Sequence, residues 1–190
     1  MIRKRVNLDQ YLCKRFLLIL HQFLFIKTNY NYYLMDNNCP FCSNTMLHNA
    51  FLETRNFLAI YNIAPVLPGH ALVISLRHVE SAFELSHEER IEMVEFLQKT
   101  TKILLKAFRG EGFDWSLQEK ECAGQSIPHL HVHVVIRRVG DLDSDGKWYP
   151  MVEENDNHLL DSHLRPKLSQ NEMISITRNL KAIANQLSEE

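Results

Sequence analysis

Three histidines alternate with apolar residues late in the chain, at His129, His131 and His133. Successive side chains of a strand point to opposite faces, so the three imidazoles are predicted to line one face while Leu130 and Val132 line the other. With a rise of about 3.3 Å per residue they stand about 7 Å apart, a scale on which neighbouring phosphate oxygens can be engaged. Neutral imidazole can attack phosphorus or ligate a metal, so a metal-dependent hydrolase with three histidine ligands stays an alternative.

A second chemical motif is the pair Cys39-Pro-Phe-Cys42. Two cysteines at this spacing are typical of metal ligands or of a redox pair, although no strand-then-helix pattern of a redox site surrounds them. The other two cysteines, Cys13 and Cys122, have no partner at a recognisable spacing and are interpreted as bystanders. Four unevenly spread cysteines do not form a disulfide framework, which favours a reducing compartment, and we expect the cytoplasm.

The elements that must position these side chains can be predicted from the pattern of apolar residues. Alternating and β-branched segments predict strands at residues 57–62, 70–76, 113–118 and 129–138. The first two are separated by residues 63–69, whose two prolines and one glycine indicate a tight, hairpin-like connection. The motifs therefore lie on a β-sheet or on the loops that join its strands.

Two helices are predicted from capping boxes followed by apolar residues at helical spacing. Ser86 and Glu89 begin a long amphipathic helix that runs up to Gly110. Ser169 and Glu172 begin a C-terminal helix with one narrow apolar seam, which could pack on the sheet or pair with a second subunit. Strands and helices together predict an α+β fold.

Length and charge limit the class of protein. The 190 residues favour one domain, and a net charge of -2 provides no basic field for a nucleic acid polymer. No stretch reaches the roughly 20 apolar residues that span a bilayer, so we expect no membrane partner. The apolar run at residues 16–26 is superficially similar to a signal peptide, but His21 and Gln22 interrupt it and no small-residue cleavage site follows.

The expected organisation has three parts. Residues 1–34 are interpreted as an N-terminal extension that lies upstream of the true start at Met35, residues 35–140 as the domain that holds the motifs, and residues 141–190 as an acidic loop and C-terminal helix of the same domain. The loop begins like a calcium-binding loop at Asp141, but its twelfth position is Val152 instead of a bidentate glutamate. A turn-rich acidic loop is therefore the better interpretation.

The run of residues 129–135, His-apolar-His-apolar-His-apolar-apolar, resembles the signature of the histidine triad family of nucleotide hydrolases and transferases. Residues 62–74 resemble the family's ribose-binding hairpin, and residues 123–125 resemble its phosphate loop. Asn62, Gln118 and residues 124–129 are most similar to the fragile-histidine-triad branch, which cleaves dinucleoside polyphosphates. The likeness covers roughly residues 39–138 and implies the histidine triad fold, an antiparallel sheet of about five strands with a long amphipathic helix and a C-terminal helix.

The resemblance also implies roles in a two-step displacement on a nucleotide substrate. His131 would attack the α-phosphorus to form a nucleotidyl-histidine, which water then hydrolyses. This needs a neutral ring whose other nitrogen is held by a carbonyl. Asn62 would hold the ribose hydroxyls, and His70 would hydrogen-bond from behind the site. The side chains expected on the phosphate oxygens are His133, Gln118, Gln125 and Ser126, with His129 completing the catalytic triad.

In zinc-bearing members of the family, a cysteine pair joins a histidine after the hairpin and the first histidine of the triad. His78 and His129 stand at the matching places, which implies a closed Cys2His2 zinc site with Cys39 and Cys42. The fragile-histidine-triad branch usually lacks the cysteines. The resemblance implies a hydrolase of dinucleoside polyphosphates, such as diadenosine tri- or tetraphosphate, and the alternative within the family is an adenosine phosphoramidase or nucleotidyl transferase. A zinc-stabilised nucleotide-binding signalling module is a further alternative, and family members are commonly homodimers.

Overall fold

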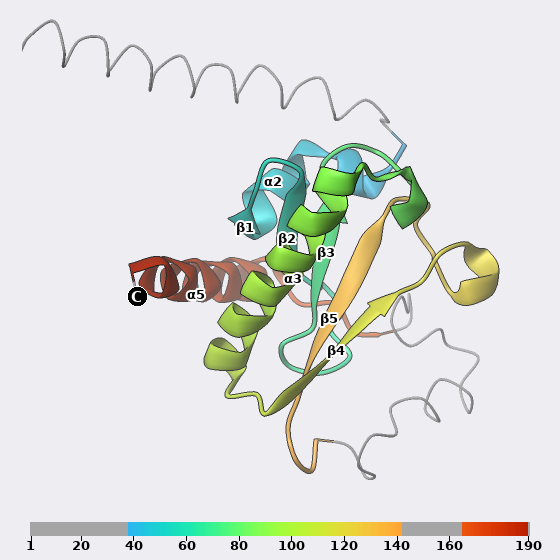
Figure 1. Cartoon of the computed structure of the whole chain (residues 1–190). Coiled ribbons are helices and arrows are strands. Elements are labelled where there is room, and N and C mark those ends of the chain that lie inside the picture. Colours follow the sequence, from blue (N-terminus) through green and yellow to red (C-terminus); the bar gives the residue numbers. More distant parts are fainter. Residues whose placement is uncertain (1–37, 142–164, 190) are drawn as a thin grey trace, which may run out of the picture.

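The computed structural model describes residues 38–141 and 165–189. In chain order these form η1 (Pro40–Cys42), α2 (Asn44–Asn49), β1 (Ala50–Glu53), β2 (Phe57–Tyr61), β3 (Ala71–Ser75), η2 (Ala82–Glu84), α3 (His87–Phe108), β4 (Gly112–Leu117), η3 (Glu121–Ala123), β5 (His131–Arg137) and α5 (Gln170–Glu189), where η marks a 3₁₀ turn (Figure 1). The interpretation of residues 1–34 concerns a segment outside the described residues and stays a prediction.

The five strands form one antiparallel sheet in the order β1-β2-β3-β5-β4. The central strands β2 and β3 are buried along their whole length, whereas β4 at one edge alternates between half-buried and exposed residues. Directly opposite residues of an antiparallel pair share a face. The pairing of Ile74 with His131 and of Leu72 with His133 therefore puts both histidines on one face of the sheet.

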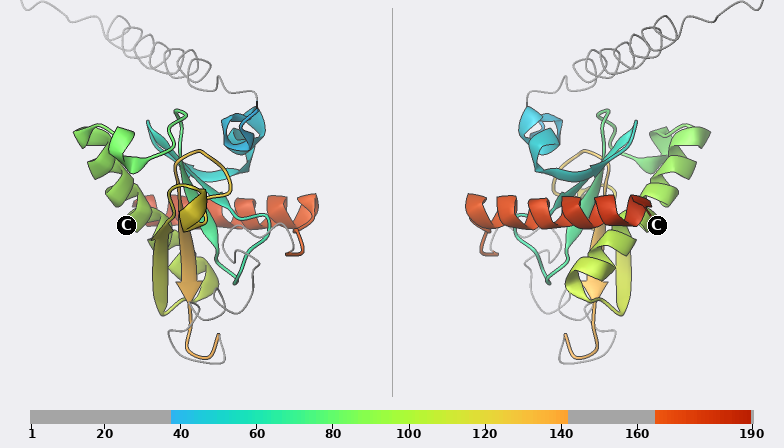
Figure 2. Two further views of the ribbon diagram at one scale, coloured as in Figure 1. Left: turned by 90° about the vertical axis from the view of Figure 1, so that its right-hand side faces the viewer. Right: turned by 90° about the vertical axis from the view of Figure 1, so that its left-hand side faces the viewer.

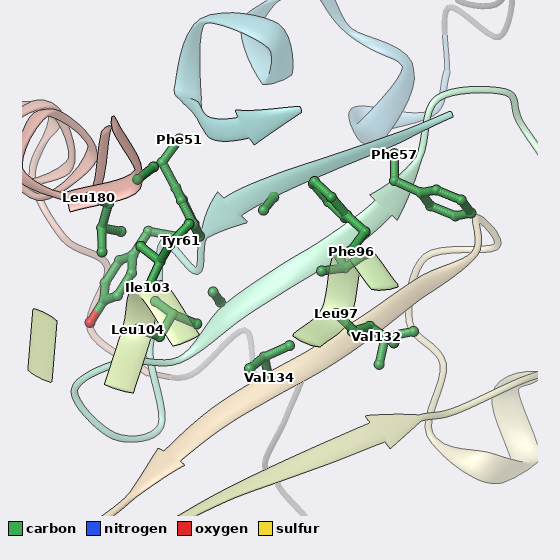
Figure 3. Packing of buried hydrophobic residues seen from close by; sticks show 14 of the residues in the cluster. Phe51, Phe57, Tyr61, Phe96, Leu97, Ile103, Leu104, Val132, Val134 and Leu180 are labelled. Carbon is green, nitrogen blue, oxygen red and sulfur yellow. The ribbon is translucent and has the colours of Figure 1, made fainter. Parts of the chain in front are cut away.

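Helices α3 and α5 cover the opposite face (Figure 2). Their apolar side chains pack against the inward residues of the sheet, and Figure 3 shows Leu97 and Leu104 of α3 with Val132 and Val134 of β5. Helix α3 begins where Ser86 and Glu89 form a reciprocal capping box, and ends at Arg109, whose backbone is left-handed at φ 52°. This face is the main hydrophobic core of the described residues.

The histidine-bearing face has a smaller apolar cluster of its own. Leu58, Ile60, Leu72 and Ile74 of the central strands are buried there beneath the segment that carries Cys39, Phe41 and Cys42. The two sides of the sheet are therefore buried by different means, by long helices on one side and by a short N-terminal segment and loops on the other. The second side is where the chemistry-bearing residues lie.

The predicted α+β fold, with five antiparallel strands, a long helix and a C-terminal helix, is confirmed. The hairpin between β2 and β3 and both capping boxes are present, the second one through hydrogen bonds between Ser169 and Glu172. Strand β1 and helix α2 were not located from the sequence. Strand β5 begins at His131, so His129 lies just before the strand, because its N–H donates to the Ile127 carbonyl in a tight turn at 2.7 Å.

Most of the acidic segment lies outside the described residues. Asp141, which opens the calcium-like pattern, accepts two hydrogen bonds of 2.9 Å from the Arg137 guanidinium. This ion pair holds the pKa of Asp141 below its usual value and occupies both carboxylate oxygens. Among the described helices, none combines the length and the apolar character needed to cross a membrane.

Candidate active site and metal centre

Strand β5 places the nucleophile candidate His131 beside His133, with ring centroids 5.0 Å apart. Both side chains are almost completely buried, as are His129 and His70. Burying polar groups is costly unless each finds a hydrogen-bond partner. The partners of these four rings therefore determine which nitrogen of each ring carries a proton.

The tautomer of His131 follows from one contact. Its Nδ1 lies 2.7 Å from the backbone carbonyl oxygen of His129. A carbonyl oxygen can only accept, so Nδ1–H donates and Nε2 keeps its lone pair in the neutral ring. The carbonyl expected from the sequence is thus supplied by the residue two positions earlier, in the turn that precedes β5. Nε2 of His131 therefore carries the lone pair that a nucleophile needs.

A chain of two hydrogen bonds through His70 determines which nitrogen of His133 carries the proton. The backbone N–H of Val66 donates to Nδ1 of His70 at 3.1 Å, so the proton of the neutral His70 ring is on Nε2. That Nε2 lies 3.0 Å from Nδ1 of His133 and donates to it. The proton of His133 is then on Nε2, which makes this nitrogen a hydrogen-bond donor. The two neighbouring rings thus present opposite tautomers, a lone pair on His131 and an N–H on His133.

The predicted ribose ligand Asn62 is buried at the end of β2, next to His70. Its Oδ1 accepts from the Ala64 N–H at 2.8 Å, which forms a turn at the start of the hairpin loop. Its Nδ2 lies 3.4 Å from Nε2 of His70. Because both of those nitrogens carry protons, the second contact is packing, and the Asn62 amide keeps donor capacity.

The loop between β4 and β5 carries the other predicted phosphate ligands. The buried Gln125 accepts from the Lys120 N–H at 2.7 Å and donates to the His129 carbonyl at 3.4 Å, so its side chain holds the loop closed. Ser126 is exposed. Gln118 lies against Gly124, and its buried Oε1 has no hydrogen-bond partner among the described residues. Gln118 is therefore the glutamine whose oxygen still has full capacity to accept.

The same loop contains a strained residue. Lys120 has φ 72° and ψ 155°, a combination that is essentially restricted to glycine and costs about 1–3 kcal/mol for other residues. Its carbonyl accepts from the N–H groups of Ala123 and Gln125, and its ammonium pairs with Glu80 at 2.9 Å. The ammonium lowers the pKa of the exposed Glu80 carboxyl. These bonds explain how the strained turn is held in place beside the site.

Cys39, Cys42, His78 and His129 come together as a group that could hold a metal ion, with all four donor atoms within 4.8 Å of one another. Nδ1 of His129 lies 3.3 and 3.5 Å from the two sulfurs, and Nδ1 of His78 lies 3.3 Å from Sγ of Cys42. A tetrahedral zinc with usual bond lengths separates a sulfur and a nitrogen ligand by about 3.6 Å. The donor set and its spacing therefore fit such an ion.

The orientation of His129 suits ligation by Nδ1. Its Nε2 lies 2.7 Å from the backbone carbonyl oxygen of Ser75, which can only accept, so the proton is on Nε2 and the lone pair of Nδ1 faces the sulfurs. The sequence showed neither this carbonyl nor the contact of Phe41 with the histidine rings. Backbone partners leave no mark in the residue types, but the position of Phe41 between the two cysteines is a signal that could have been followed.

A buried row of histidines before and within the last strand of a five-stranded antiparallel sheet, beside a metal-ligand group, defines the class of histidine triad domains. The chain belongs to the HIT domain family, whose model matches residues 45–140. It is 31% identical over 114 residues to the bis(5'-nucleosyl)-tetraphosphatase [asymmetrical] of Schizosaccharomyces pombe, which covers 60% of this chain and 63% of that protein. Over 104 residues it is 31% identical to the bis(5'-adenosyl)-triphosphatase of Dictyostelium discoideum, covering 55% of this chain and 70% of that protein.

Among solved structures, the chain is similar to a zinc-bound histidine triad family protein from Mycobacterium smegmatis. The TM-score is 0.58 at 25% identity, and the match covers 80% of this chain and 96% of that one. The chain spans about two thirds of the length of the curated relatives it matches. The family and the fold follow from these matches.

Proposed function

We propose that the chain hydrolyses dinucleoside polyphosphates, with diadenosine tri- and tetraphosphate first among substrates. The observation that carries the proposal is the pair of opposite tautomers, because Nε2 of His131 can attack phosphorus while Nε2–H of His133 donates to an oxygen beside it. Identity of 31% to proteins named for these two activities supports the choice of substrate.

In the first step the lone pair on Nε2 of His131 forms a bond to the α-phosphorus. The bond from that phosphorus to the bridging oxygen breaks, and the oxygen leaves with the electron pair as a nucleoside polyphosphate shorter by one phosphate. The N–H of His133 stabilises the negative charge on the transferring group. The product of this step on the protein is a nucleotidyl-His131.

In the second step water attacks the same phosphorus. The water oxygen bonds to phosphorus as the P–N bond breaks, the electron pair of that bond returns to Nε2 of His131, and the proton lost by water passes to solvent as the nucleoside monophosphate is released. One water is consumed for each dinucleotide, and the ring returns to its starting tautomer. The division of one displacement into two is the usual benefit of covalent catalysis.

Binding of the nucleotide is assigned to the residues around this pair. We propose that the Asn62 amide holds the ribose hydroxyls and that the Nε2–H2 group of Gln118 donates to the phosphate chain. We also assign Ser126 to the phosphate oxygens, because it is exposed in the loop between β4 and β5. Gln125 acts mainly by holding that loop closed, since both ends of its amide bind the chain. His70 fixes the proton of His133 from behind.

For the metal group we propose zinc, held by Cys39, Cys42, His78 and His129. Zinc would supply a closed four-ligand cross-link between the N-terminal segment and the two histidines, with no open position for water. Elemental analysis of the protein as isolated tests this, and less than about 0.1 equivalent of metal would contradict it. The paired thiolates favour a reducing compartment, and we propose the cytoplasm.

We also propose that the chain forms a homodimer through β4 and α3. Strand β4 is an edge of the described sheet, and it presents exposed Phe113, Trp115 and Leu117 on the side of α3. Ile91 and Val94 of α3 are exposed to 49% and 44%. A patch of this kind on an edge strand is unusual for a monomer. A second copy would cover both the edge and the patch.

Light scattering of the purified chain tests the dimer. Leu117→Glu introduces a charge into the patch and is expected to give monomers, whereas Ile174→Glu on α5, where the side chain is similarly exposed, leaves the dimer intact. A monomeric wild-type chain at micromolar concentration would contradict the proposal.

The activity is tested with a panel of diadenosine triphosphate, diadenosine tetraphosphate and an adenylyl-amine conjugate. We expect hydrolysis of the two polyphosphates, and abolition in His131→Ala by about 10⁴-fold or more. His87→Ala, which removes an exposed histidine at the start of α3, is the matched control and should retain activity. Turnover of the amine conjugate alone would instead assign the chain as an adenosine phosphoramidase.

A further inference from the structure

Phe41 links the cysteine segment to the nucleophile candidate. It lies in the η1 turn between the two cysteines, with only 8% of its surface exposed. Its ring meets the ring of His131 edge-on, with centroids 5.2 Å apart, and the ring of His129 likewise, at 5.8 Å. One side chain from the N-terminal segment therefore touches both a metal-ligand histidine and the histidine assigned to attack phosphorus.

The position of Phe41 depends on the two cysteines that flank it. The turn is closed by a hydrogen bond of 3.1 Å from the Cys42 N–H to the Cys39 carbonyl, and both sulfurs face Nδ1 of His129. A bond from each sulfur to one ion would fix both ends of the turn relative to His129. The intervening phenyl ring would then have little freedom to withdraw from His131.

Among the described residues, at least three contacts restrain the ring of His131, and two of them come from His129 and from the turn between the two cysteines. Its Nδ1–H donates to the carbonyl of His129, and the ring makes T-shaped contacts with the rings of Phe41 and His133. Rotation of the imidazole about its Cβ–Cγ bond would replace Nε2 with a carbon atom. A ring that contacts it edge-on resists that rotation, because aromatic pairs are attractive only over limited geometries.

We propose that Phe41 is a positioning residue that couples ligation of the cysteine pair to the orientation of the His131 ring. When the four-ligand group is complete, Phe41 and the His129 carbonyl together hold Nε2 of His131 toward the substrate. The expected effect on turnover rests on the proposed function. The restraint on the orientation of the His131 ring does not, because it is present without any nucleotide.

The test uses the Nδ1–H proton of His131 in the nucleotide-free, zinc-loaded full chain, observed by NMR of protein with ¹⁵N-labelled histidine. A buried N–H bonded to a carbonyl exchanges slowly with water. In Phe41→Leu we expect exchange to become about three- to tenfold faster, the range that an aromatic pair contributes. Phe41→Tyr keeps the ring and should retain the wild-type exchange rate. Removing zinc from the wild type should also accelerate exchange.

The matched control is Phe96→Leu, which makes the same substitution in a buried stacked pair on the helix-covered face. It should lower the melting temperature and leave the His131 signal unchanged. With a dinucleoside polyphosphate, Phe41→Leu should lower kcat by about three- to tenfold with KM within about twofold, while metal content stays at the wild-type level.

An unchanged Nδ1–H exchange rate in Phe41→Leu, or a change confined to KM, would overturn the proposal. If Phe41→Leu does not retain zinc, the exchange rate of the His131 Nδ1–H is compared between zinc-loaded and zinc-free wild type. Equal rates in these two samples would overturn the proposal. If the wild type hydrolyses nothing in the panel, the proposed function fails, yet the exchange measurement still decides whether Phe41 orients His131.

Discussion

The two faces of the sheet are built from different kinds of residue, although they share the same strands. The helix-covered face buries aliphatic and aromatic side chains from α3, α5 and alternate positions of β2, β3 and β5 (Figure 3). The other face buries four histidines, Asn62 and Gln125, each held by specific hydrogen bonds. The first face tolerates any side chain of suitable volume, whereas on the second a single lost partner changes a proton position.

This difference predicts that substitutions on the two faces separate stability from chemistry. On the helix-covered face the cost of a change is set by cavity and contact area. On the histidine face the cost of a change is set by hydrogen-bond partners and by the proposed zinc ligands. These ligands also anchor the segment that covers this face, where no long helix packs. Four substitutions test where this division holds, and two of them are paired with a matched control variant.

The largest effect on stability is expected from Cys42→Ser. Losing one of four ligands would release the metal and leave the N-terminal segment unanchored, at a cost of about 4 kcal/mol or more. Differential scanning calorimetry and elemental analysis measure both effects. Cys122→Ser, which changes an exposed cysteine, is the control. Equal melting temperatures for the two variants would contradict a structural role for the metal group.

Leu104→Ala tests the helix-covered face. Leu104 is completely buried, so its truncation should leave a cavity and cost about 2–5 kcal/mol. We expect a melting temperature lower by about 4–20 °C for a chain of this size, with kcat unchanged below the transition. A kcat reduced by the same factor as in a site variant would show that the two faces are not independent.

How much of this could be predicted from the sequence differs between the fold and the site. The hairpin and the two long helices follow from local signals, the turn residues 63–69 and the capping boxes of Ser86 and Ser169. Strand β1 has four residues with no alternation, and its burial depends on α5, more than a hundred residues later. A short element that is stabilised by distant contacts gives little local signal.

In the site, the alternating spacing predicted that His131 and His133 share one face, and the family resemblance implied the four metal-ligand candidates that the fold brings together. A carbonyl partner for His131 could be expected, but the identity of the groups that set the protons could not be predicted, because the carbonyls of Ser75 and His129 and the N–H of Val66 belong to the backbone. The sequence indicates which side chains can do chemistry, while the fold determines the nitrogen that each one presents.

Gly124→Ala tests the loop between β4 and β5, where backbone strain and the position of Gln118 can be separated. Gly124 has φ 97°, and an added Cβ would lie 2.8 Å from Nε2 of Gln118. We expect a loss of about 1–2 kcal/mol of stability from backbone strain, and about tenfold lower kcat/KM because Gln118 is displaced. Gly140→Ala has positive φ as well but open space around it, so it should show the strain alone. Equal kcat/KM in the two variants would argue against a role for Gln118.

The smallest effect is expected at the base of α3. The Arg77 guanidinium lowers the pKa of the Glu89 carboxyl to about 2. The ion pair therefore stabilises the fold fully above about pH 4.3, the pKa of a glutamate in the unfolded chain, and this stabilisation is lost as the pH falls toward 2. Since Arg77 is about one third exposed, we expect only about 1 kcal/mol at pH 7 between wild type and Glu89→Gln. Urea titrations should show this difference vanishing by about pH 2, and a constant difference would contradict the assignment.

If His131 carries the nucleotide during turnover, rapid-quench mass spectrometry can detect the nucleotidyl group on the protein itself. The chain is mixed with diadenosine triphosphate, quenched within one turnover under alkaline conditions that preserve phosphoramidates, and digested. We expect an adenylyl group on the peptide that contains His131, located on that residue by fragmentation and absent from His131→Ala. Hydrolysis that proceeds with no adduct, or with the adduct on another residue, would contradict it.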